Sequence, residues 1–230
     1  MQIKDKKVLI IGGGSKIASA IAKRLLEQGA TIILQYRNHK PIINKVKLLQ
    51  VDLQEEKDCE NLISSYLKLE SSGPDIFINC IGDFSYKHFK DLTFQEFKQI
   101  IDSNLYIAFN LCKLILPLMK EKKEARILHF GYSGANILEA KPSILPYHIS
   151  KIGVSLLTKT IAQTYAPNIL ANCLCLGIAE NNDFDFSNKI PLARPVKLEE
   201  IAEAVEFLIK SDYITATDFY LDGGFRPTYS

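Results

Sequence analysis

The stretch that decides the fold is Val8-Leu9-Ile10-Ile11-Gly12-Gly13-Gly14-Ser15-Lys16-Ile17-Ala18. A short, continuous apolar run leads into a glycine-rich turn, and residues 17–28 then carry apolar side chains at helical period. Gly29 ends that helix, and residues 31–36 form a second apolar run. The order of strand, helix and strand predicts a βαβ unit in which the glycine turn joins the first strand to the first helix.

The same alternation continues along the rest of the chain. Further strands are expected at residues 46–51, 76–80, 126–130, 171–175 and 218–221, and further helices at residues 55–70, 94–118, 146–165 and 198–209. Apolar strands that alternate with helices predict a parallel sheet covered on both faces, which is a doubly wound α/β fold. The 230 residues, 47% of them hydrophobic, suffice for one substantial core, so we expect a single domain over residues 1–230.

Charge and hydropathy exclude several classes of partner. The net charge is only +2 and the charged residues are scattered, so we expect no nucleic-acid partner. No apolar run approaches the length of a membrane span, so we expect no membrane partner. The start of the chain runs straight into the first apolar strand and leaves no room for a signal peptide, which predicts a cytoplasmic protein.

The five cysteines are odd in number, and most lie in apolar surroundings, so a disulfide framework is not expected. Cys173 and Cys175 would point to the same face of a strand. No other cysteine or histidine near them completes a set of zinc ligands. We therefore expect small, buried thiols and no metal site.

The glycine turn and the end of the second strand predict a nucleotide site. A turn of this kind lets the backbone approach a pyrophosphate, and the N-terminus of the following helix favours its negative charge. An NAD site would place an acidic residue after the second strand, but the chain has Tyr36-Arg37-Asn38-His39 there. Arg37 suits a 2'-phosphate, and Lys16 in the turn adds a second positive charge. The sequence thus predicts NADP(H) rather than NAD(H).

Tyr147 and Lys151 are spaced as Tyr-x-x-x-Lys within a predicted helix. This i,i+4 spacing places a phenol and an ammonium on one face, where the cation can stabilise a phenolate. The pair is therefore a candidate for proton transfer.

Taken in order, these motifs resemble those of the short-chain dehydrogenases/reductases, and the likeness covers nearly the whole chain. The glycine turn is similar to the family's Thr-Gly-x-x-x-Gly-x-Gly turn, and Tyr147 and Lys151 match its catalytic pair. Further matches are Asp52, the segment Asn79-Cys80-Ile81-Gly82, Asn104, the segment Asn172-Cys173-Leu174-Cys175-Leu176-Gly177 and Asp222-Gly223-Gly224. The resemblance implies a Rossmann-type fold and hydride transfer between a nicotinamide and a carbonyl or imine carbon.

The resemblance also implies roles for individual residues. Tyr147 would donate the proton, with its pKa lowered by the positive charge of Lys151 and of the oxidised nicotinamide. Asn104 would position a water that links Lys151 to solvent. The residues expected to bind the cofactor are Gly12, Ser15, Lys16, Ile17, Tyr36, Arg37, Asn38, Asp52, Leu53, Asn79, Cys80, Ile81, Gly82, Tyr147, Lys151, Gly177 and Ile178.

One departure concerns the family's catalytic serine, which follows the fifth strand. An ungapped match places Tyr132 at this position and Ser133 next to it. The connection to Tyr147 is longer than usual, so we expect Ser133 to orient the substrate oxygen, with Tyr132 as the alternative hydrogen-bond donor. Leu176, in place of the family's proline, is a second departure.

Within the family, the chain resembles the pteridine reductases. They share a basic residue where Lys16 stands and a tyrosine with basic neighbours where Tyr36 and Arg37 stand, and they carry an aromatic residue where Phe84 falls. The likeness implies a pterin that stacks on Phe84.

Two alternatives remain. Lys87, His88 and Lys90 suit a 3-oxoacyl-thioester reductase with an acidic carrier protein, and the missing serine suits a non-catalytic NADP(H)-binding sensor or scaffold. The long helices at 94–118 and 146–165 resemble the pair through which family members dimerise, which implies a homodimer or homotetramer. Residues 179–188 show little periodicity and are expected to form a loop.

Overall fold

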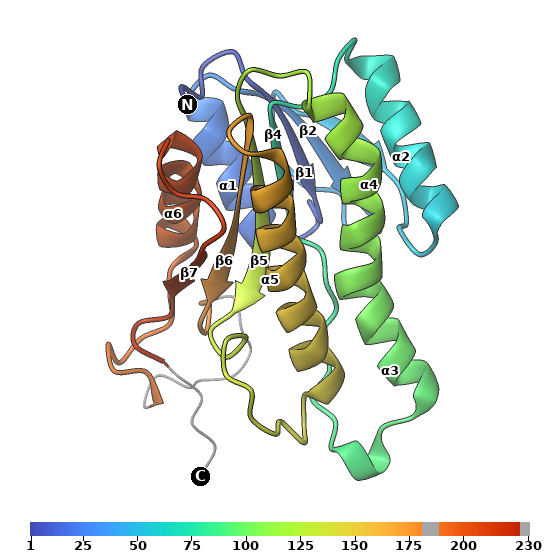
Figure 1. Ribbon diagram of the computed structural model, residues 1–230, viewed down its shortest axis with the longest axis vertical. Helices are drawn as coiled ribbons and strands as arrows, with labels where there is room; N and C mark the ends of the chain where they lie inside the picture. Colours follow the sequence, from blue (N-terminus) through green and yellow to red (C-terminus); the bar gives the residue numbers. More distant parts are fainter. Residues whose placement is uncertain (181–188, 226–230) are drawn as a thin grey trace.

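The computed structural model describes residues 1–180 and 189–225, and it has one seven-stranded, entirely parallel sheet (Figure 1). The strand order is β3-β2-β1-β4-β5-β6-β7. The strands are β1 (Lys7–Ile11), β2 (Thr31–Tyr36), β3 (Lys47–Gln50), β4 (Ile76–Asn79), β5 (Ala125–Tyr132), β6 (Ile169–Leu176) and β7 (Asp218–Leu221). The chain order reverses direction between β1 and β4, and this is the switch point at which such sheets bind ligands.

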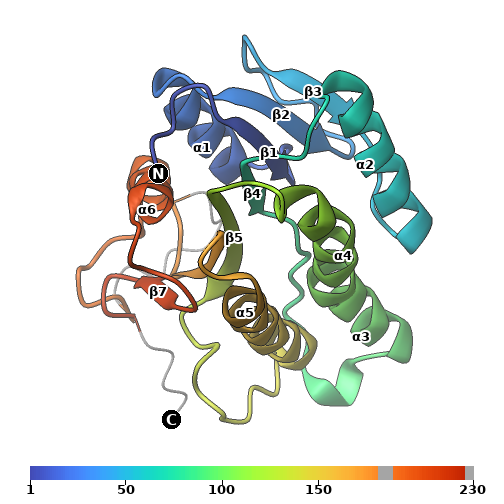
Figure 2. The same cartoon turned by 45° about the horizontal axis from the view of Figure 1, so that its top comes forward.

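The helices cover both faces of the sheet (Figure 2). One face carries α1 (Lys16–Glu27) and α6 (Leu198–Lys210). The other carries α2 (Glu56–Leu69), α4 (Ile107–Met119) and α5 (Leu145–Tyr165), and α3 (Phe94–Ile101) extends α4 beyond the sheet. Alternate residues of β1 enter the two cores: Val8 and Ile10 pack with α1 and α6, and Leu9 and Ile11 pack with α2 and α4. The doubly wound α/β prediction is confirmed.

Most element boundaries differ from the predicted ones by one or two residues. The main difference lies in the predicted helix 94–118, which contains a π-helical turn at Asp102–Tyr106 between α3 and α4. The described residues 37–46, between β2 and β3, form no helix. Strand β5 continues to Tyr132, beyond its predicted end at residue 130. Because Tyr132 pairs with Leu176 in the ladder, a proline at 176 would place a residue without an N–H there.

The expectation that no apolar run approaches the length of a membrane span is corrected by one segment. Phe94–Met119 is long and apolar enough to cross a membrane by length and composition. It has 26 residues and a mean hydropathy of 1.2 in its most apolar window, and half of that window is buried inside the fold. Ile107, Leu111 and Ile115 of α4 are fully buried against the sheet and α2. Packing in the core thus accounts for the apolar character of this helix.

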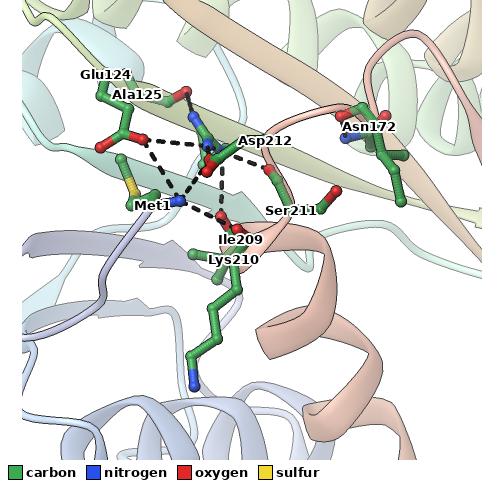
Figure 3. A network of polar contacts seen from close by, with 10 residues as sticks. Met1, Glu124, Ala125, Asn172, Ile209, Lys210, Ser211 and Asp212 are labelled. Carbon is green, nitrogen blue, oxygen red and sulfur yellow. Dashed lines mark hydrogen bonds and ion pairs between the residues drawn. The ribbon is translucent and has the colours of Figure 1, made fainter.

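A buried arginine ties the amino edge of the sheet to the end of α6. Arg126 is 3% exposed, and its guanidinium donates to the carbonyls of Ile209 (3.0 Å) and Ser211 (3.2 Å) and to the Asp212 carboxylate (2.6 Å). The Met1 ammonium also donates to Asp212, at 2.5 Å (Figure 3). The last carbonyls of α6 thereby find donors that the helix itself cannot supply.

Candidate active site

The glycine turn lies at the carboxyl end of β1, against the end of β2. Gly12 has φ +86°, and its N–H donates to the side-chain oxygen of Gln35 (2.9 Å). A Cβ on Gly13 would lie 2.4 Å from Leu34 Cγ and 2.8 Å from the Gln35 carbonyl oxygen, so no larger residue fits. The Ser15 hydroxyl caps α1 by accepting from Ala18 N–H (3.1 Å), and the first turn of α1 holds no acidic residue. This backbone and helix terminus fit a pyrophosphate.

The end of β2 carries positive charge without an acid. Tyr36 is buried, with its hydroxyl 3.4 Å from the Gln50 side chain, whereas Arg37 and Asn38 are exposed. The Gln50 amide donates to the Arg37 carbonyl (3.1 Å), which fixes the backbone and leaves the guanidinium at the surface. Lys16 is also exposed, at the first position of α1. The cationic side chains expected for a 2'-phosphate thus stand at the surface beside the glycine turn.

The ends of β3 and β4 lie at the same edge of the sheet. Asp52 and Leu53 follow β3, and Asn79 is the last residue of β4. Asp52 accepts from the Gln54 amide (2.9 Å), and Leu53 is buried. The Asn79 side chain accepts from Ile81 N–H (3.1 Å), which holds the backbone after β4. Burial raises the pKa of the Cys80 thiol to about 12, so it is uncharged.

Tyr147 and Lys151 lie one turn apart near the start of α5. Lys151 is 5% exposed, and its ammonium lies 5.5 Å from the centroid of the Tyr147 ring and donates to the Phe130 carbonyl (2.9 Å). Burial lowers the pKa of Lys151 to about 8. Burial raises the pKa of Tyr147, and the negative charge that Cys175 and Cys173 acquire at high pH raises it further. The sequence argument expected the opposite direction for Tyr147, but here desolvation dominates and the phenol is neutral.

Asn104 lies in the π-helical turn, and its side chain and that of Lys151 both approach Gly82. Its amide nitrogen donates to the carbonyls of Asp83 (2.7 Å) and Ile100 (3.0 Å). Its oxygen Oδ1 is buried and has no hydrogen-bond donor among the described residues. A Cβ on Gly82, whose φ is +147°, would lie 2.1 Å from Oδ1 and 3.3 Å from Lys151 Nζ. An acceptor and an ammonium thus approach the same point, which only glycine leaves open.

Tyr132 lies beside Tyr147, with 5.5 Å between the ring centroids. Its hydroxyl is hydrogen-bonded to Nδ1 of His148, which is buried, and burial lowers the pKa of this histidine. A Cβ on Gly134 would come within 2.6 Å of the Tyr132 ring, so this glycine makes room for it. Ser133, the residue expected to orient the substrate, is 3% exposed, and its N–H donates to the Leu176 carbonyl (2.9 Å). Of the two candidate residues, Tyr132 is thus the one whose side chain lies beside Tyr147.

Phe84 is the third aromatic residue at this point, and it meets the Tyr147 ring edge-on at 5.0 Å. Its side chain is 60% exposed, so it has an open face beside Tyr147. Gly177 follows β6, where its N–H donates to the Leu221 carbonyl (3.1 Å), and the Ile178 carbonyl accepts from Val196 N–H (2.9 Å). In the loop expected at 179–188, residues 181–188 lie outside the described residues.

The structure thus brings together, at the carboxyl edge of the sheet, the glycine turn, Asn104, Tyr147, Lys151 and Phe84. Sequence reasoning missed His148 and Gly134. No motif marks either residue, because each matters through the orientation of one aromatic ring.

Comparisons with known proteins agree with this arrangement. A family model described as enoyl-(acyl carrier protein) reductase matches residues 12–226. The putative oxidoreductase YtkK of Bacillus subtilis is 25% identical, and the match covers 95% of this chain and 96% of YtkK. The 3alpha-hydroxysteroid dehydrogenase of Mediterraneibacter gnavus is 27% identical, over 98% of this chain and 99% of that protein. The ligand-free structure of aldohexose dehydrogenase from Thermoplasma acidophilum has a TM-score of 0.89 at 26% identity, over 99% of this chain and 98% of that one.

Proposed function

This chain belongs to the short-chain dehydrogenase/reductase family, and on that premise we propose that it reduces a carbonyl or imine carbon with NADPH, with Tyr147 as the proton donor. The observation that carries the proposal is the approach of Asn104 and Lys151 to the same point at Gly82, with the Tyr147 ring 5.5 Å from the Lys151 ammonium, beside a turn that fits a pyrophosphate. Burial of Lys151 lowers its pKa, and no carboxylate among the described residues offsets this effect, so the lysine is costly to keep and a functional role is favoured. Tyr147 carries its proton in this structure, and the positive charge of the oxidised nicotinamide would lower its pKa when the cofactor is bound.

The residues that would hold the cofactor are those of the glycine turn, Ser15 at the cap of α1, and Arg37 with Lys16 at the 2'-phosphate. When bound, the nicotinamide supplies the hydride. Lys151 has three N–H donors and uses one of them on Phe130, so the others are available to a ribose hydroxyl and to the proton path. The unpartnered Oδ1 of Asn104 accepts a hydrogen bond from a water in that path.

Tyr132 rather than Ser133 fills the place of the family's serine in this proposal. The Tyr132 ring stands against Tyr147, and His148 and Gly134 fix its orientation. The pair of variants Tyr132→Phe and Ser133→Ala separates the two assignments. We expect kcat/KM to fall roughly 10- to 100-fold in the first, as for loss of one positioning hydrogen bond, and to change little in the second. The reverse order would return the role to Ser133.

The preference for NADP(H) rests on Arg37 and Lys16, with no acidic residue among residues 37–40. Titration of the protein with NADPH and NADH, followed by quenching of tyrosine fluorescence, measures it directly. Loss of one charge-assisted contact in Arg37→Ala should weaken NADPH binding by about 1.5–3 kcal/mol, roughly 10- to 150-fold, and leave NADH binding unchanged. Tighter binding of NADH by the wild-type protein would overturn the assignment.

For the substrate we favour a planar heterocycle such as a dihydropterin. Phe84, with an exposed ring edge-on to Tyr147, and the neighbouring Tyr132 ring provide aromatic surfaces for a flat ring system. The acyl-thioester alternative needs a basic entrance, but Lys87 is neutralised by Glu96 at 2.5 Å, which leaves His88 and Lys90 at the surface for this role. The sensor alternative predicts tight NADPH binding without turnover. NADPH oxidation measured with dihydrobiopterin, acetoacetyl thioesters, ketones and quinones discriminates among the three.

The decisive test of the reaction is Tyr147→Phe, with Tyr165→Phe on the same helix as its matched control. Removal of the proton donor should lower kcat roughly 100- to 10,000-fold and change NADPH affinity far less, because the other cofactor-binding residues remain. Activity of Tyr147→Phe at the wild-type level would end this mechanism.

We also propose that the protein is a cytoplasmic homodimer or homotetramer. The exposed apolar side chains of Tyr106, Phe109, Ile149 and Leu156 on and beside α4 and α5 support self-association. Light scattering of the protein after gel filtration tests this, since a monomer at micromolar concentration would contradict it.

A further inference from the structure

Three side chains of types that can bind a metal, Cys173, Cys175 and Asp218, lie close together near Tyr147 and Lys151. Cys173 and Cys175 lie two residues apart on β6 and so point to the same face of the sheet, and Asp218 is the β7 partner of Cys173 in the ladder. The two sulfur atoms and a carboxylate oxygen of Asp218 all lie within 4.8 Å of one another. Both cysteines are fully buried. The cluster was invisible to a sequence search for nearby Cys or His, because its third member is a carboxylate from the next strand of the sheet.

The backbone opposite the cysteines leaves space for the cluster. Gly131 on β5 is the ladder partner of Cys175, and a Cβ on it would lie 2.7 Å from the Cys175 sulfur and 2.9 Å from the Cys173 sulfur. Both sulfur atoms therefore point toward one spot above a residue without a side chain. This convergence is what a shared ligand requires.

The carboxylate of Asp218 is oriented by two residues of α5. The Ser155 hydroxyl lies 2.7 Å from Oδ1 and 2.9 Å from Oδ2, and Lys159 donates to Oδ2 at 2.5 Å. A carboxylate has about four acceptor positions, so Oδ1 retains one. Groups that hold a ligating carboxylate in this way are the usual outer partners of a metal site.

The charges balance with a divalent cation. Replacement of the two S–H protons by one M²⁺ leaves the cluster at the single negative charge of Asp218, and Lys159 neutralises it. Around a tetrahedral zinc, two sulfurs at about 2.3 Å from the metal stand about 3.8 Å apart. The sulfurs therefore need to approach by no more than about 1 Å.

We propose that Cys173, Cys175 and Asp218 form a binding site for one thiophilic divalent cation of the zinc class. The ion would join β6 to β7 under α5, with a fourth coordination position left for water. Since binding exchanges two protons for two positive charges, it leaves the local field at Lys151 nearly unchanged. Because the ion would join β6 to β7, its binding should stabilise the folded chain. The metal site does not depend on the proposed reaction.

The test uses the full chain, reduced and freed of metal by a chelator. Titration with Cd²⁺ should produce the ultraviolet absorption of cadmium–thiolate bonds and saturate at one ion per chain. Calorimetry with Zn²⁺ in two buffers of different ionisation enthalpy should show two protons released. Cys173→Ala and Cys175→Ala should abolish the cadmium signal, Asp218→Asn should weaken binding at least tenfold, and the matched control Cys112→Ala, another buried thiol, should bind like the wild type.

X-ray absorption of the zinc-loaded wild-type protein keeps the proposal falsifiable if the cysteine variants fail to fold. It should show two sulfur neighbours at about 2.3 Å. No saturable binding by the wild type, an oxygen- and nitrogen-only zinc environment, or unchanged cadmium absorption in Cys173→Ala would each overturn the site. No substrate enters these measurements, so their outcome is separate from that of the Tyr147→Phe experiment.

Discussion

The buried imidazole of His129 should make the protein lose stability in mild acid. His129 on β5 is fully buried, with none of its side chain exposed to solvent, and its ring packs edge-on against Phe77. Thr158 donates its hydroxyl hydrogen to the Val154 carbonyl (2.7 Å), so its oxygen accepts from His129 Nδ1–H at 2.9 Å. The other ring nitrogen, Nε2, then accepts from the thiol of Cys112 (3.4 Å). The neutral imidazole is thus fully hydrogen-bonded, and a second proton has no acceptor.

The magnitude follows from the pKa. Burial, followed by the charge of Lys151, lowers the pKa of His129 from 6.5 to about 4. Below pH 6.5 the unfolded chain binds a proton that the native protein does not, so stability falls as the pH falls toward 4. The full loss is about 3.4 kcal/mol, and the part between pH 7 and pH 5 is about 1.8 kcal/mol.

Urea unfolding at pH 7 and pH 5 measures this loss in the wild type and in His129→Phe. The phenylalanine variant has a different stability at pH 7, but the decrease on going to pH 5 should be smaller by about 1.8 kcal/mol. His88→Phe, the same change at an exposed histidine, should keep the wild-type decrease. Equal decreases in all three proteins would refute the assignment of the acid sensitivity to His129. The carboxylates with lowered pKa lose a little of their stabilisation by pH 5, but they do so equally in all three proteins and cancel in the comparison.

Three further outcomes are expected. Arg126→Met should cost about 3 kcal/mol in thermal or urea unfolding, because it strands buried carbonyls and a carboxylate, whereas Arg194→Met at an exposed ion pair should cost less than about 1 kcal/mol. Gly82→Ala should abolish activity and lower stability by about 1–3 kcal/mol, since its Cβ would collide with Asn104; wild-type turnover would show that the gap is not needed. Burial lowers the pKa of Lys151 to about 8, and only the ammonium form of this lysine serves the reaction. We therefore expect kcat/KM to fall roughly tenfold per pH unit above pH 8. A kcat/KM that stays constant up to about pH 10 would exclude a catalytic role for the Lys151 ammonium.

Periodicity and turn residues were enough to predict the fold, because seven short apolar strands alternate with helices in the chain. The same signals placed Tyr147 and Lys151 on one helix and the glycine turn after β1. They did not reveal the π-helical turn that holds Asn104, because a single turn of five residues is too short to show a period of its own. The prediction that no apolar run approaches the length of a membrane span was wrong for Phe94–Met119, which is long and apolar enough by length and composition, and half of its most apolar window is buried inside the fold.

Other features depend on the register between strands or on the orientation of one ring, and no local pattern encodes them. The approach of Asp218 to Cys173 follows from the pairing of β6 with β7. The contact of Tyr132 with His148 depends on the two extra residues of β5 and on the space above Gly134. The direction of the pKa of Tyr147 reversed because the extent of its burial is a property of the folded chain.

The Arg126 cluster lies at the amino edge of the sheet, where Arg126 pairs with the first residue of β4, and the candidate active site lies at the opposite edge. Loops at the carboxyl edge can therefore accumulate substitutions without loosening the clamp that joins Met1, β5 and α6. Such a division of labour favours evolvability: new substrate preferences can arise at one end while the other end preserves the folded state. In a mutational scan, substitutions around Arg126 should lower abundance, whereas substitutions of exposed residues at the carboxyl edge, such as Arg37, should lower turnover without lowering abundance.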